Sequence, residues 1–367
     1  MAPAPLIPEY HDRCVSNVLE AIVAPPRRPD APLADFRSAI TGAAKVVLVI
    51  LDGLGDLQLV DRSRLAPTML AGRLEPITSV APTTTAAALT SLTTGVAPGR
   101  HGIVGYRFAM GPSILQSLRW TVDDHDAQRA LPPERVQRST PLLQNRGLGI
   151  PYVAKLQFAA SGFTKAHLRG ARYVGVKDVD TMAGAVIEAL IESDVVLCYH
   201  DAIDKTAHAE GLGDAYEAAL ARAEQLIVDL RRQVGDDTAI VITSDHGQVD
   251  VGATSVELPR RVTSMIDRMS GEGRFRWLHL DVGDRAAVLG ILDEVRSSCW
   301  VLSRRDVMDS GMLGDVDDEV AERLGDVAII PFVDAFVPNP AEPNEVRMRS
   351  RHGSLTPAEM YVPLSVC

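Results

Sequence analysis

Three short apolar runs in this sequence are each followed directly by aspartate or histidine. The runs and the residues after them are 46–51 with Asp52, 195–199 with His200 and Asp201, and 239–243 with Ser244, Asp245 and His246. Runs that are apolar at every position are typical of parallel strands that are covered on both faces. In such sheets, ligands bind outside the carboxyl ends of the strands. The sequence therefore predicts that carboxylates and imidazoles gather at one edge of a sheet.

Segments with helical spacing separate these runs. Apolar side chains recur near helical spacing in residues 178–193, and a second stripe of this kind starts at Asp214. A third helix is expected in the alanine-rich segment 83–94, which ends before Gly95. The alternation of strands and helices predicts an α/β fold. We expect a mostly parallel central sheet with helices on both of its faces.

The pattern changes on either side of this alternation. Residues 1–44 are rich in proline and alanine and are expected to form an N-terminal surface segment. Residues 45–254 and 327–367 are expected to form the core domain. Residues 255–326 interrupt it with many charges and are expected to form an inserted, cap-like subdomain.

Composition and length argue against several classes of protein. The 367 residues, 46% of them hydrophobic, suffice for one large domain or two ordinary ones. The net charge of −11 argues against a general nucleic-acid-binding surface. No apolar run approaches the roughly 20 residues that span a membrane, and the first residues lack a signal-peptide pattern. The four cysteines are scattered and form no Cys-x-x-Cys pair, so a cytoplasmic protein is expected.

Asp204 and His208 are a further pair of candidate metal ligands. They are four residues apart, so on a helical turn both side chains project from the same face and can reach one ion. The alternative is a helix cap with a surface histidine, and Asp245 could equally cap the helix that follows its strand. With His352 far downstream, these individually weak signals together indicate a site for a hard metal or zinc.

Three consecutive threonines, Thr83, Thr84 and Thr85, open the alanine-rich helix. A threonine at this place can simply cap the helix. The free N–H groups of a helix N-terminus also favour a phosphate, and a threonine hydroxyl beside a divalent metal can lose its proton and attack phosphorus. The sequence has no Gly-x-Ser-x-Gly, His-Glu-x-x-His, P-loop or Cys/Ser-x-Pro-x-Arg motif. A serine hydrolase, a zincin protease, a nucleotide kinase and a sulfatase are therefore disfavoured.

In order and spacing, these motifs resemble the alkaline phosphatase superfamily, most of all its nucleotide pyrophosphatase/phosphodiesterase branch. The resemblance extends over 46–364. The matching segments are Leu51-Asp52-Gly53, Pro82-Thr83-Thr84-Thr85, Thr94-Gly95, His101-Gly102, Tyr199 with Asp204 and His208, Ser244-Asp245-His246-Gly247, and His352-Gly353. The resemblance implies an alkaline phosphatase-like fold with a catalytic core of 45–254 and 327–367. It also implies two zinc ions, one held by Asp204, His208 and His352, the other by Asp52, Asp245, His246 and the nucleophile.

The resemblance implies a threonine nucleophile as well. In the family pattern Pro-Thr-x-Thr the second threonine attacks, and the threonine of a Thr-Gly pair follows nine residues later. Counting forward from Pro82 and back from Thr94 both give Thr85, with Thr84 as the alternative.

Three places depart from the family pattern: Ala88, the segment Lys205-Thr206-Ala207 between Asp204 and His208, and Arg351. Many members carry Pro-Asn-His soon after the nucleophile, and its asparagine holds a phosphate oxygen, but Ala88 stands at that position here. Losing one such donor typically costs ~3 kcal/mol of transition-state stabilisation. A backbone N–H of the helix, Lys155 or Lys205 could replace it. Arg351, beside His352, could bind an anionic group or be a solvated arginine.

The other histidines lack a comparable context. His101 lies in a Pro-Gly-Arg-His-Gly turn and is expected to be structural. His200 could support the site from behind its ligands. The histidines without supporting partners in the sequence are His11, His125, His167 and His279.

The function that the resemblance implies is a metal-dependent phosphodiesterase or nucleotide pyrophosphatase-type hydrolase. It would use two divalent ions, zinc by resemblance, a phosphothreonine intermediate, and a small-molecule phosphate ester or nucleotide as substrate. Neither a membrane nor nucleic acid in general is an expected partner, and the oligomeric state is left open. The alternatives are a phosphomonoesterase, phosphonate hydrolase or phosphomutase on the same scaffold, and a metal-binding protein without catalysis.

Overall fold

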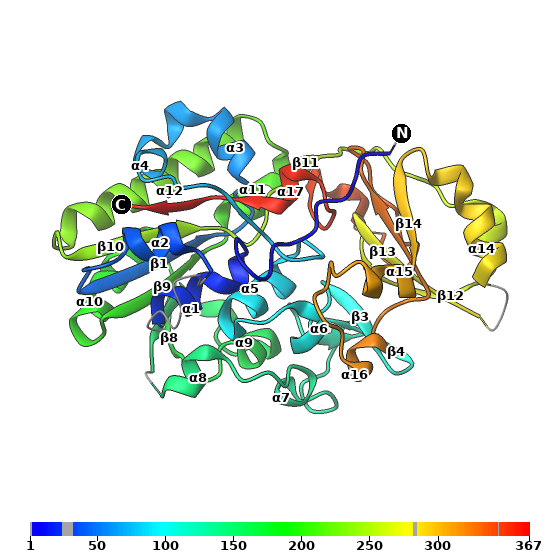
Figure 1. Ribbon diagram of the computed structural model, residues 1–367, viewed down its shortest axis with the longest axis horizontal. Helices are drawn as coiled ribbons and strands as arrows, with labels where there is room; N and C mark the ends of the chain where they lie inside the picture. Colours follow the sequence, from blue (N-terminus) through cyan, green and yellow to red (C-terminus); the bar gives the residue numbers. More distant parts are fainter. Residues whose placement is uncertain (1, 24–31, 148, 282–284, 344) are drawn as a thin grey trace.

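The computed structural model describes residues 2–23, 32–147, 149–281, 285–343 and 345–367. Its largest sheet has six strands (Figure 1). In spatial order they are β18 (Leu364–Val366), β10 (Thr238–Thr243), β1 (Lys45–Leu51), β9 (Val195–His200), β7 (Pro151–Lys155) and β8 (Arg172–Val176). All pairings are parallel except that of β18 with β10. The predicted fold class, α/β with a mostly parallel central sheet, is confirmed.

Alternate side chains of β1 enter two different hydrophobic cores. Positions 46, 48 and 50 belong to one cluster, and positions 47, 49 and 51 belong to the other. Helices α1 (Val18–Val23), α5 (Thr85–Thr94) and α9 (Gly162–His167) contribute to the first cluster. Helices α10 (Met182–Glu192), α11 (Ala202–Glu210) and α12 (Asp214–Gln233) contribute to the second. Because both faces of the sheet are buried, the strand is apolar at every position.

A smaller antiparallel sheet forms the other end of the molecule (Figure 1). Its strands, in order, are β12 (Ile266–Glu272), β13 (Phe275–Leu280), β15 (Val327–Pro331) and β14 (Cys299–Ser303), with helices α14 (Arg285–Ile291) and α15 (Arg304–Asp309) beside them. β15 begins where the range 327–367 begins, yet it pairs with β13 and β14. The division into 1–44, 45–254 with 327–367, and 255–326 stays a prediction.

Short elements connect these two parts. Three small antiparallel sheets are present. One has four strands, β3 (Arg107–Met110), β4 (Ser113–Gln116), β5 (Thr121–Val122) and β6 (His125–Asp126). The other two pair β2 (Ile77–Thr78) with β17 (Tyr361–Val362) and β11 (Val249–Asp250) with β16 (Ser350–Arg351). The remaining helices are α2 (Ala34–Ala39), α3 (Asp56–Asp61), α4 (Pro67–Ala71), α6 (Pro98–His101), α7 (Pro133–Val136), α8 (Leu142–Arg146), α13 (Arg260–Thr263), α16 (Asp318–Ala321) and α17 (Pro357–Met360). Within the described ranges, every helix is too short or too polar to cross a membrane.

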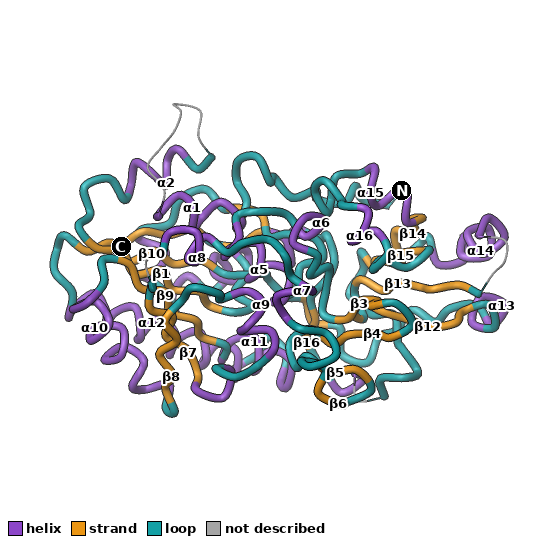
Figure 2. Tube along the Cα trace, turned by 90° about the horizontal axis from the view of Figure 1, so that it is seen from below, coloured by secondary structure: helices purple, strands orange, loops and turns teal. Residues whose placement is uncertain are grey.

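The N-terminal segment is tied to both ends of the molecule. Leu19 and Phe36 are fully buried in the first core cluster, against the central sheet. At the other end, the Trp300 indole N–H donates to the carbonyl oxygen of Pro3 at 2.7 Å. Figure 2, seen from below, shows the central sheet and the smaller sheet at opposite ends of an elongated molecule. The described part of 1–44 therefore packs into the fold as well as lying on its surface.

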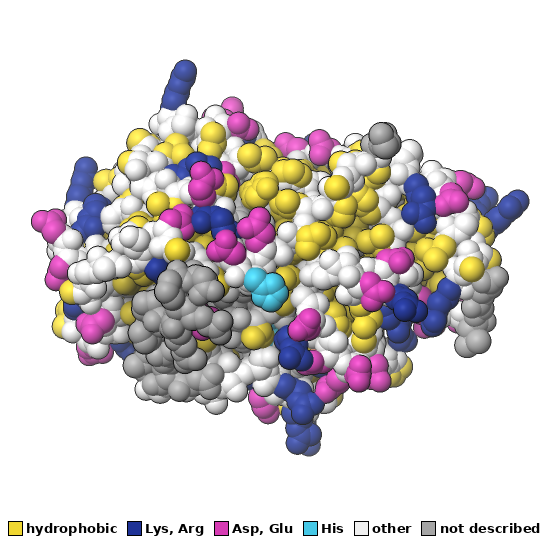
Figure 3. Space-filling view, in the orientation of Figure 1, with side chains coloured by type: hydrophobic (Ala, Val, Ile, Leu, Met, Phe, Trp, Pro, Cys, Tyr) yellow, Lys and Arg dark blue, Asp and Glu magenta, His cyan; other side chains and the backbone are white. Residues whose placement is uncertain are grey.

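The face of the molecule in Figure 3 mixes acidic, basic and hydrophobic side chains. Lys and Arg side chains are interspersed with Asp and Glu side chains on this face.

Candidate active site

The carboxyl ends of three adjacent strands bring most of the predicted ligands together. Asp52 follows β1, which lies between β9 and β10 in the sheet. Asp245 and His246 follow β10, whereas Asp204 and His208 lie on α11, the helix after β9. The Asp204 N–H donates to the carbonyl oxygen of Asp52 at 3.1 Å, so the start of α11 is fixed against the end of β1.

His352 reaches this edge from the far end of the chain. β16 pairs antiparallel with β11, with Arg351 opposite Val249, and His352 is the next residue. The rings of His352 and His246 stack with their centroids 3.6 Å apart. All seven site residues predicted from the sequence therefore lie around one region: Asp52, Thr85, Asp204, His208, Asp245, His246 and His352.

The three imidazoles share one hydrogen-bonding pattern. In each ring, Nδ1 lies close to a backbone carbonyl oxygen. The distance is 2.8 Å from His208 Nδ1 to the oxygen of Ser350, 3.0 Å from His246 Nδ1 to that of Gly247, and 2.7 Å from His352 Nδ1 to that of Thr83. A carbonyl oxygen only accepts, so each Nδ1 carries the proton and each Nε2 has a free lone pair. This is the orientation that a metal-binding histidine needs.

Two carboxylate oxygens at the centre of the site are buried without a hydrogen-bond partner in the described structure. They are Oδ1 of Asp52 and Oδ2 of Asp245, which lie 3.5 Å and 3.6 Å from Nε2 of His246. The other oxygens are satisfied: Tyr199 donates its hydroxyl to Asp52 Oδ2, and Gly53 N–H donates to Asp245 Oδ1 at 3.1 Å. Unpaired buried oxygens facing an imidazole lone pair fit a bound cation.

Charge at the site also fits a cation. Burial, and then the negative charges of Asp245 and Asp204, raise the pKa of Asp52 well above its usual range. Burial lowers the pKa of His352 well below its usual range, and the neighbouring His246 lowers it further. His208 differs, because the carboxylate of Asp204 outweighs the effect of burial and raises the pKa of His208. The neutral imidazole of His352 beside clustered carboxylates suits a metal ligand.

The ligand atoms form two overlapping groups. Asp52, Asp245 and His246 offer atoms that all lie within 4.8 Å of one another, and so do Asp204, His246 and His352. His208 adjoins the second group, with Nε2 at 3.2 Å from Oδ1 of Asp204, and Nε2 of His352 lies 3.8 Å from the same oxygen. These residues could therefore hold two divalent ions.

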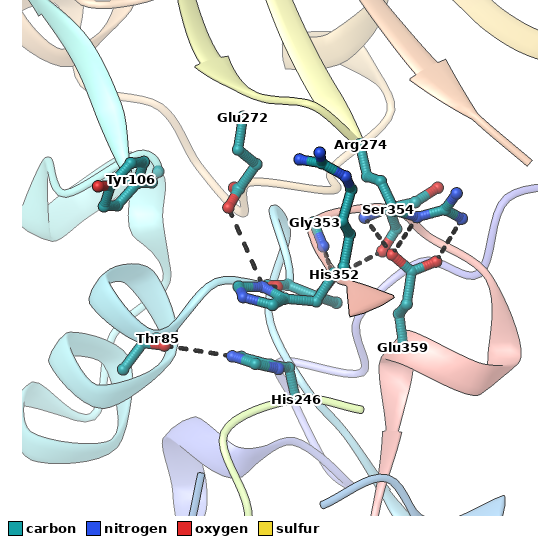
Figure 4. Close-up of polar contacts among 12 residues, drawn as sticks. Thr85, Tyr106, His246, Glu272, Arg274, His352, Gly353, Ser354 and Glu359 are labelled. Carbon is teal, nitrogen blue, oxygen red and sulfur yellow. Dashed lines mark hydrogen bonds and ion pairs between the residues drawn. The ribbon is translucent and has the colours of Figure 1, made fainter. Parts of the chain in front are cut away.

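The three threonines have different partners. Thr85 is the first residue of α5, and its Oγ1 lies 3.2 Å from Nε2 of His246 (Figure 4). Thr84 is the N-cap residue, and its hydroxyl bonds to the carboxylate of Glu272 instead. Thr83 donates its hydroxyl to the Ser354 carbonyl at 2.8 Å and accepts the Gly353 N–H at 2.9 Å. Thr85 is thus the threonine whose hydroxyl adjoins the predicted ligands.

A hairpin of the smaller sheet reaches into the site. Arg274, between β12 and β13, makes a bidentate ion pair with Glu359, with both side chains fully buried. Glu359 Oε1 also accepts the N–H of Ser354 at 3.0 Å. Glu272 of the same hairpin places Oε2 4.0 Å from Nδ1 of His352 (Figure 4). The smaller sheet therefore holds the loop that carries His352.

A cavity of about 660 Å³ opens from the ligands toward β7 and α9. Thr85, Asp52, Asp204 and His208 line one end of it. Much of the remaining lining is aromatic, and the sequence analysis did not predict that these side chains share a cavity: Tyr152, Phe158, Phe163, His167, Tyr173 and Tyr199. Phe163 and His167 lie on α9 and the others come from β7, β8, β9 and the 3-10 turn 156–158, so no single spacing in the sequence could reveal the set. The cavity offers a largely apolar, aromatic chamber beside Thr85.

Ala88 stands where many family members have an asparagine that holds a phosphate oxygen. Ala88 and the residues that could supply this contact instead lie in different surroundings. Ala88 is fully buried in the first core cluster and packs away from the cavity lining. Lys155 pairs with Asp201 at 2.6 Å, whereas Lys205 lines the cavity. Arg119, which the sequence analysis did not single out, lines it too. Lys205 and Arg119 are therefore the cations that face the cavity.

Two further expectations meet different outcomes. His101 is buried, accepts the Ile103 N–H on Nδ1 at 3.1 Å and lies 2.9 Å from the Ser91 hydroxyl, in line with a structural role. The alternative that Arg351 is a solvated surface arginine is wrong. This side chain is 3% exposed, pairs with Glu345 at 3.4 Å, and lies over the ring of Phe336 at 3.8 Å.

Solved structures with this fold include phosphoryl- and phosphonyl-processing proteins. Murine ectonucleotide pyrophosphatase/phosphodiesterase 5 matches with a TM-score of 0.65 and 17% identity, covering 88% of this chain and 87% of its own. The human protein of the same name gives a TM-score of 0.66 at 16% identity over 88% and 87%. Phosphonoacetate hydrolase from Sinorhizobium meliloti 1021, in complex with phosphonoacetate, gives 0.66 at 16% identity over 89% and 90%.

The sequence itself matches at the level of the family. A search of curated protein sequences gives no match. The family model described as type I phosphodiesterase / nucleotide pyrophosphatase matches residues 46–355, which include every predicted ligand and Thr85. This confirms the resemblance and the predicted class, a phosphoric ester hydrolase of the phosphodiesterase and pyrophosphatase type. The chain belongs to the type I phosphodiesterase / nucleotide pyrophosphatase family.

Proposed function

We propose that this protein hydrolyses phosphodiesters or nucleotide pyrophosphate bonds with Thr85 as nucleophile and two divalent metal ions, zinc in the first instance. The observation that carries the proposal is the position of Thr85. Its hydroxyl oxygen lies 3.2 Å from Nε2 of His246, which in turn lies 3.5 Å and 3.6 Å from the unpaired oxygens of Asp52 and Asp245.

The ligand division that we propose follows these contacts. Asp204, His208 and His352 would hold one ion, and Asp52, Asp245, His246 and Thr85 the other. When bound, such a pair of ions makes the threonine hydroxyl more acidic and offsets negative charge on the phosphoryl group and the leaving oxygen. Zinc suits this set because imidazole nitrogens and carboxylate oxygens are among its usual ligands.

The chain's own residues supply the rest of the reaction. Thr85 Oγ1 gives up its proton to solvent and forms a bond to phosphorus while the bond to the leaving oxygen breaks; the leaving group departs with the electron pair and gains a proton from solvent. Water then attacks phosphorus and loses a proton, the bond from phosphorus to Oγ1 breaks, Oγ1 regains a proton, and the phosphate product is released. Thr85 is the first residue of α5, so the unpaired N–H groups of the first turn are available to a phosphoryl oxygen. These N–H groups and Lys205 are our candidates to replace the missing asparagine.

The test is turnover of bis-p-nitrophenyl phosphate by zinc-loaded protein. Thr85→Ala should reduce turnover by several orders of magnitude, and Thr84→Ala should retain most of it because Thr84 faces Glu272. Undiminished turnover in Thr85→Ala would sink the assignment of the nucleophile. Activity that survived exhaustive chelation would exclude the metal-dependent mechanism altogether.

A phosphonate hydrolase on the same scaffold is the second candidate. Phosphonoacetate hydrolase is among the matching folds, and Lys205 and Arg119 could receive a carboxylate in the cavity. Comparison of phosphonoacetate, phosphomonoesters and diesters at equal concentration separates the candidates. A phosphomutase would be identified by phosphoryl transfer within one molecule. Metal binding without turnover of any of these compounds would indicate the non-catalytic alternative.

We also propose a cytoplasmic location. All four cysteines are free, and Cys14, Cys198 and Cys299 are buried. This pattern suits a reducing compartment. Fractionation of the source cells with an activity assay tests it.

A further inference from the structure

Gln248 is a fully buried glutamine that contacts a proposed metal ligand and that the reaction above does not use. It lies directly before β11, between His246 and the strand. Its Nε2 donates to Oδ1 of Asp204 at 3.0 Å, and its Oε1 accepts the hydroxyl proton of Ser350 at 2.9 Å. The amide also passes over Gly53, where an added side chain would collide with Nε2. Side chains therefore satisfy both ends of this buried amide.

The orientation of the amide follows from its partners. A carboxylate accepts hydrogen bonds and donates none, so the NH2 group of Gln248 must face Asp204 and the amide oxygen must face Ser350. An amide turned the other way would set two acceptor oxygens against each other. The Ser350 hydroxyl, which also lies 3.0 Å from the Val249 carbonyl oxygen, shares its proton between two acceptors. Ser350 thus helps to keep the donor of Gln248 aimed at Asp204.

Ser350 holds a second proposed ligand through its backbone. Its carbonyl oxygen accepts the Nδ1 proton of His208 at 2.8 Å. The N–H of the preceding residue, Arg349, donates to the backbone carbonyl oxygen of His208 at 2.8 Å. One short segment, 349–350, therefore contacts His208 directly and Asp204 through the amide of Gln248.

The oxygen that Gln248 contacts is the one that faces the imidazoles. Oδ1 of Asp204 lies 3.2 Å from Nε2 of His208 and 3.8 Å from Nε2 of His352. A carboxylate oxygen has two lone pairs, so it can accept the amide proton and bind a cation at the same time. The amide thus holds the carboxylate in the rotation that presents this oxygen to both rings, and without it the carboxylate is free to turn.

We propose that Gln248 is a positioning residue for one of the two metal ions, and that Ser350 links it to His208. The inference rests on the proposed function, in which Asp204, His208 and His352 hold that ion. Supporting contacts of this kind orient a ligand and typically contribute about 10–100-fold to metal affinity.

The other ion should be insensitive to this contact. Its proposed ligands include Asp52, Asp245 and Thr85, and the hydrogen bonds that the structure describes for the Gln248 side chain reach none of these three. A change at Gln248 should therefore separate the two ions, which a general loss of stability would not do.

The test is a two-step competition for zinc between the protein and a chelator. Gln248→Met keeps an unbranched side chain of similar size and removes the amide. We expect one ion to bind about 10–100-fold more weakly and the other to bind within about twofold of the wild type. Ser350→Ala keeps the carbonyl that holds His208 but leaves the amide free to turn, so it should weaken the same ion by a smaller factor.

Gln137→Met is the matched control. Gln137 is also fully buried, but its amide donates to the backbone carbonyl oxygen of Ala166 at 3.1 Å, away from the proposed ligands. Both ions should bind to this variant as they do to the wild type. The same loss in Gln137→Met as in Gln248→Met would overturn the role of Gln248.

The other outcomes also decide. Unchanged affinity for both ions in Gln248→Met, or an equal loss of both, would overturn the inference while the proposed function stands. If Gln248→Met does not fold, Ser350→Ala decides in its place, and unchanged affinity there would count against the link. Wild-type protein that failed to bind two zinc ions would refute the proposed two-metal function, and this inference with it, before any variant is made.

Discussion

Arg274 and Glu359 form a bidentate ion pair in which neither side chain is exposed to solvent. The pair joins the β12–β13 hairpin to α17, and Glu359 also holds the N–H of Ser354, two residues after His352. Breaking a buried pair leaves a charge without a partner, which typically costs ~3–5 kcal/mol. We therefore expect Arg274→Gln to lower the free energy of unfolding by about this amount in urea denaturation.

The same variant should bind zinc more weakly, because the loop of His352 loses its support. Supporting contacts of this kind are typically worth about 10–100-fold in metal affinity, which competition with a chelator would measure. Arg323→Gln is the matched control. Arg323 is also buried and donates to two carbonyl oxygens, those of Gly102 and Val136, far from His352 in the sequence. If both variants lost zinc affinity equally, the loss would reflect general destabilisation.

Tyr199 should support metal binding through Asp52. Its hydroxyl donates to Oδ2 and leaves Oδ1 free to face His246. Tyr199→Phe removes this donor but keeps the ring, so we expect zinc affinity to fall by about 10–100-fold with little change in the thermal midpoint of the metal-free protein. Tyr173→Phe removes a hydroxyl that bonds to the Lys155 carbonyl and should leave zinc affinity unchanged.

Stability should decrease as the pH falls, and His101 should contribute to the decrease. Burial lowers the pKa of His101 to about 3, whereas an unfolded histidine has a pKa near 6.5. Between these values the unfolded chain binds the additional proton, so stability is complete above pH 6.5 and is lost toward pH 3. The loss from this residue is about 2 kcal/mol at pH 5. Urea denaturation of His101→Gln at pH 7 and pH 5 should show a smaller pH effect than in the wild type.

Restoring asparagine at position 88 should harm the protein rather than improve catalysis. Ala88 is fully buried in the hydrophobic core and does not line the cavity. A buried amide without a partner typically costs about 1–3 kcal/mol. We expect Ala88→Asn to unfold at lower temperature without a gain in kcat, and a clear gain would contradict the position of Ala88 in the core.

The sequence predicted the features that depend on strand order and local spacing. Asp52 and Asp245 were identified because each follows a fully apolar strand, and parallel strands end at the same edge. His352 was found through the family resemblance, since no local pattern links it to residues so distant. The partners Arg274 and Glu359 are 85 positions apart, and their contact depends on how the two sheets pack. The aromatic lining of the cavity escaped prediction for the same reason, because Tyr152, Phe158 and His167 come from three different elements.

The antiparallel pairing of β11 with β16 has a consequence for how the protein is made. It brings His352 to the other proposed ligands only after the smaller sheet has been synthesised. The edge strand β18, which adjoins β10, emerges later still. A chain growing on the ribosome would therefore hold an incomplete set of the proposed metal ligands until the segment after the smaller sheet emerges, and hydrolysis could begin only after that.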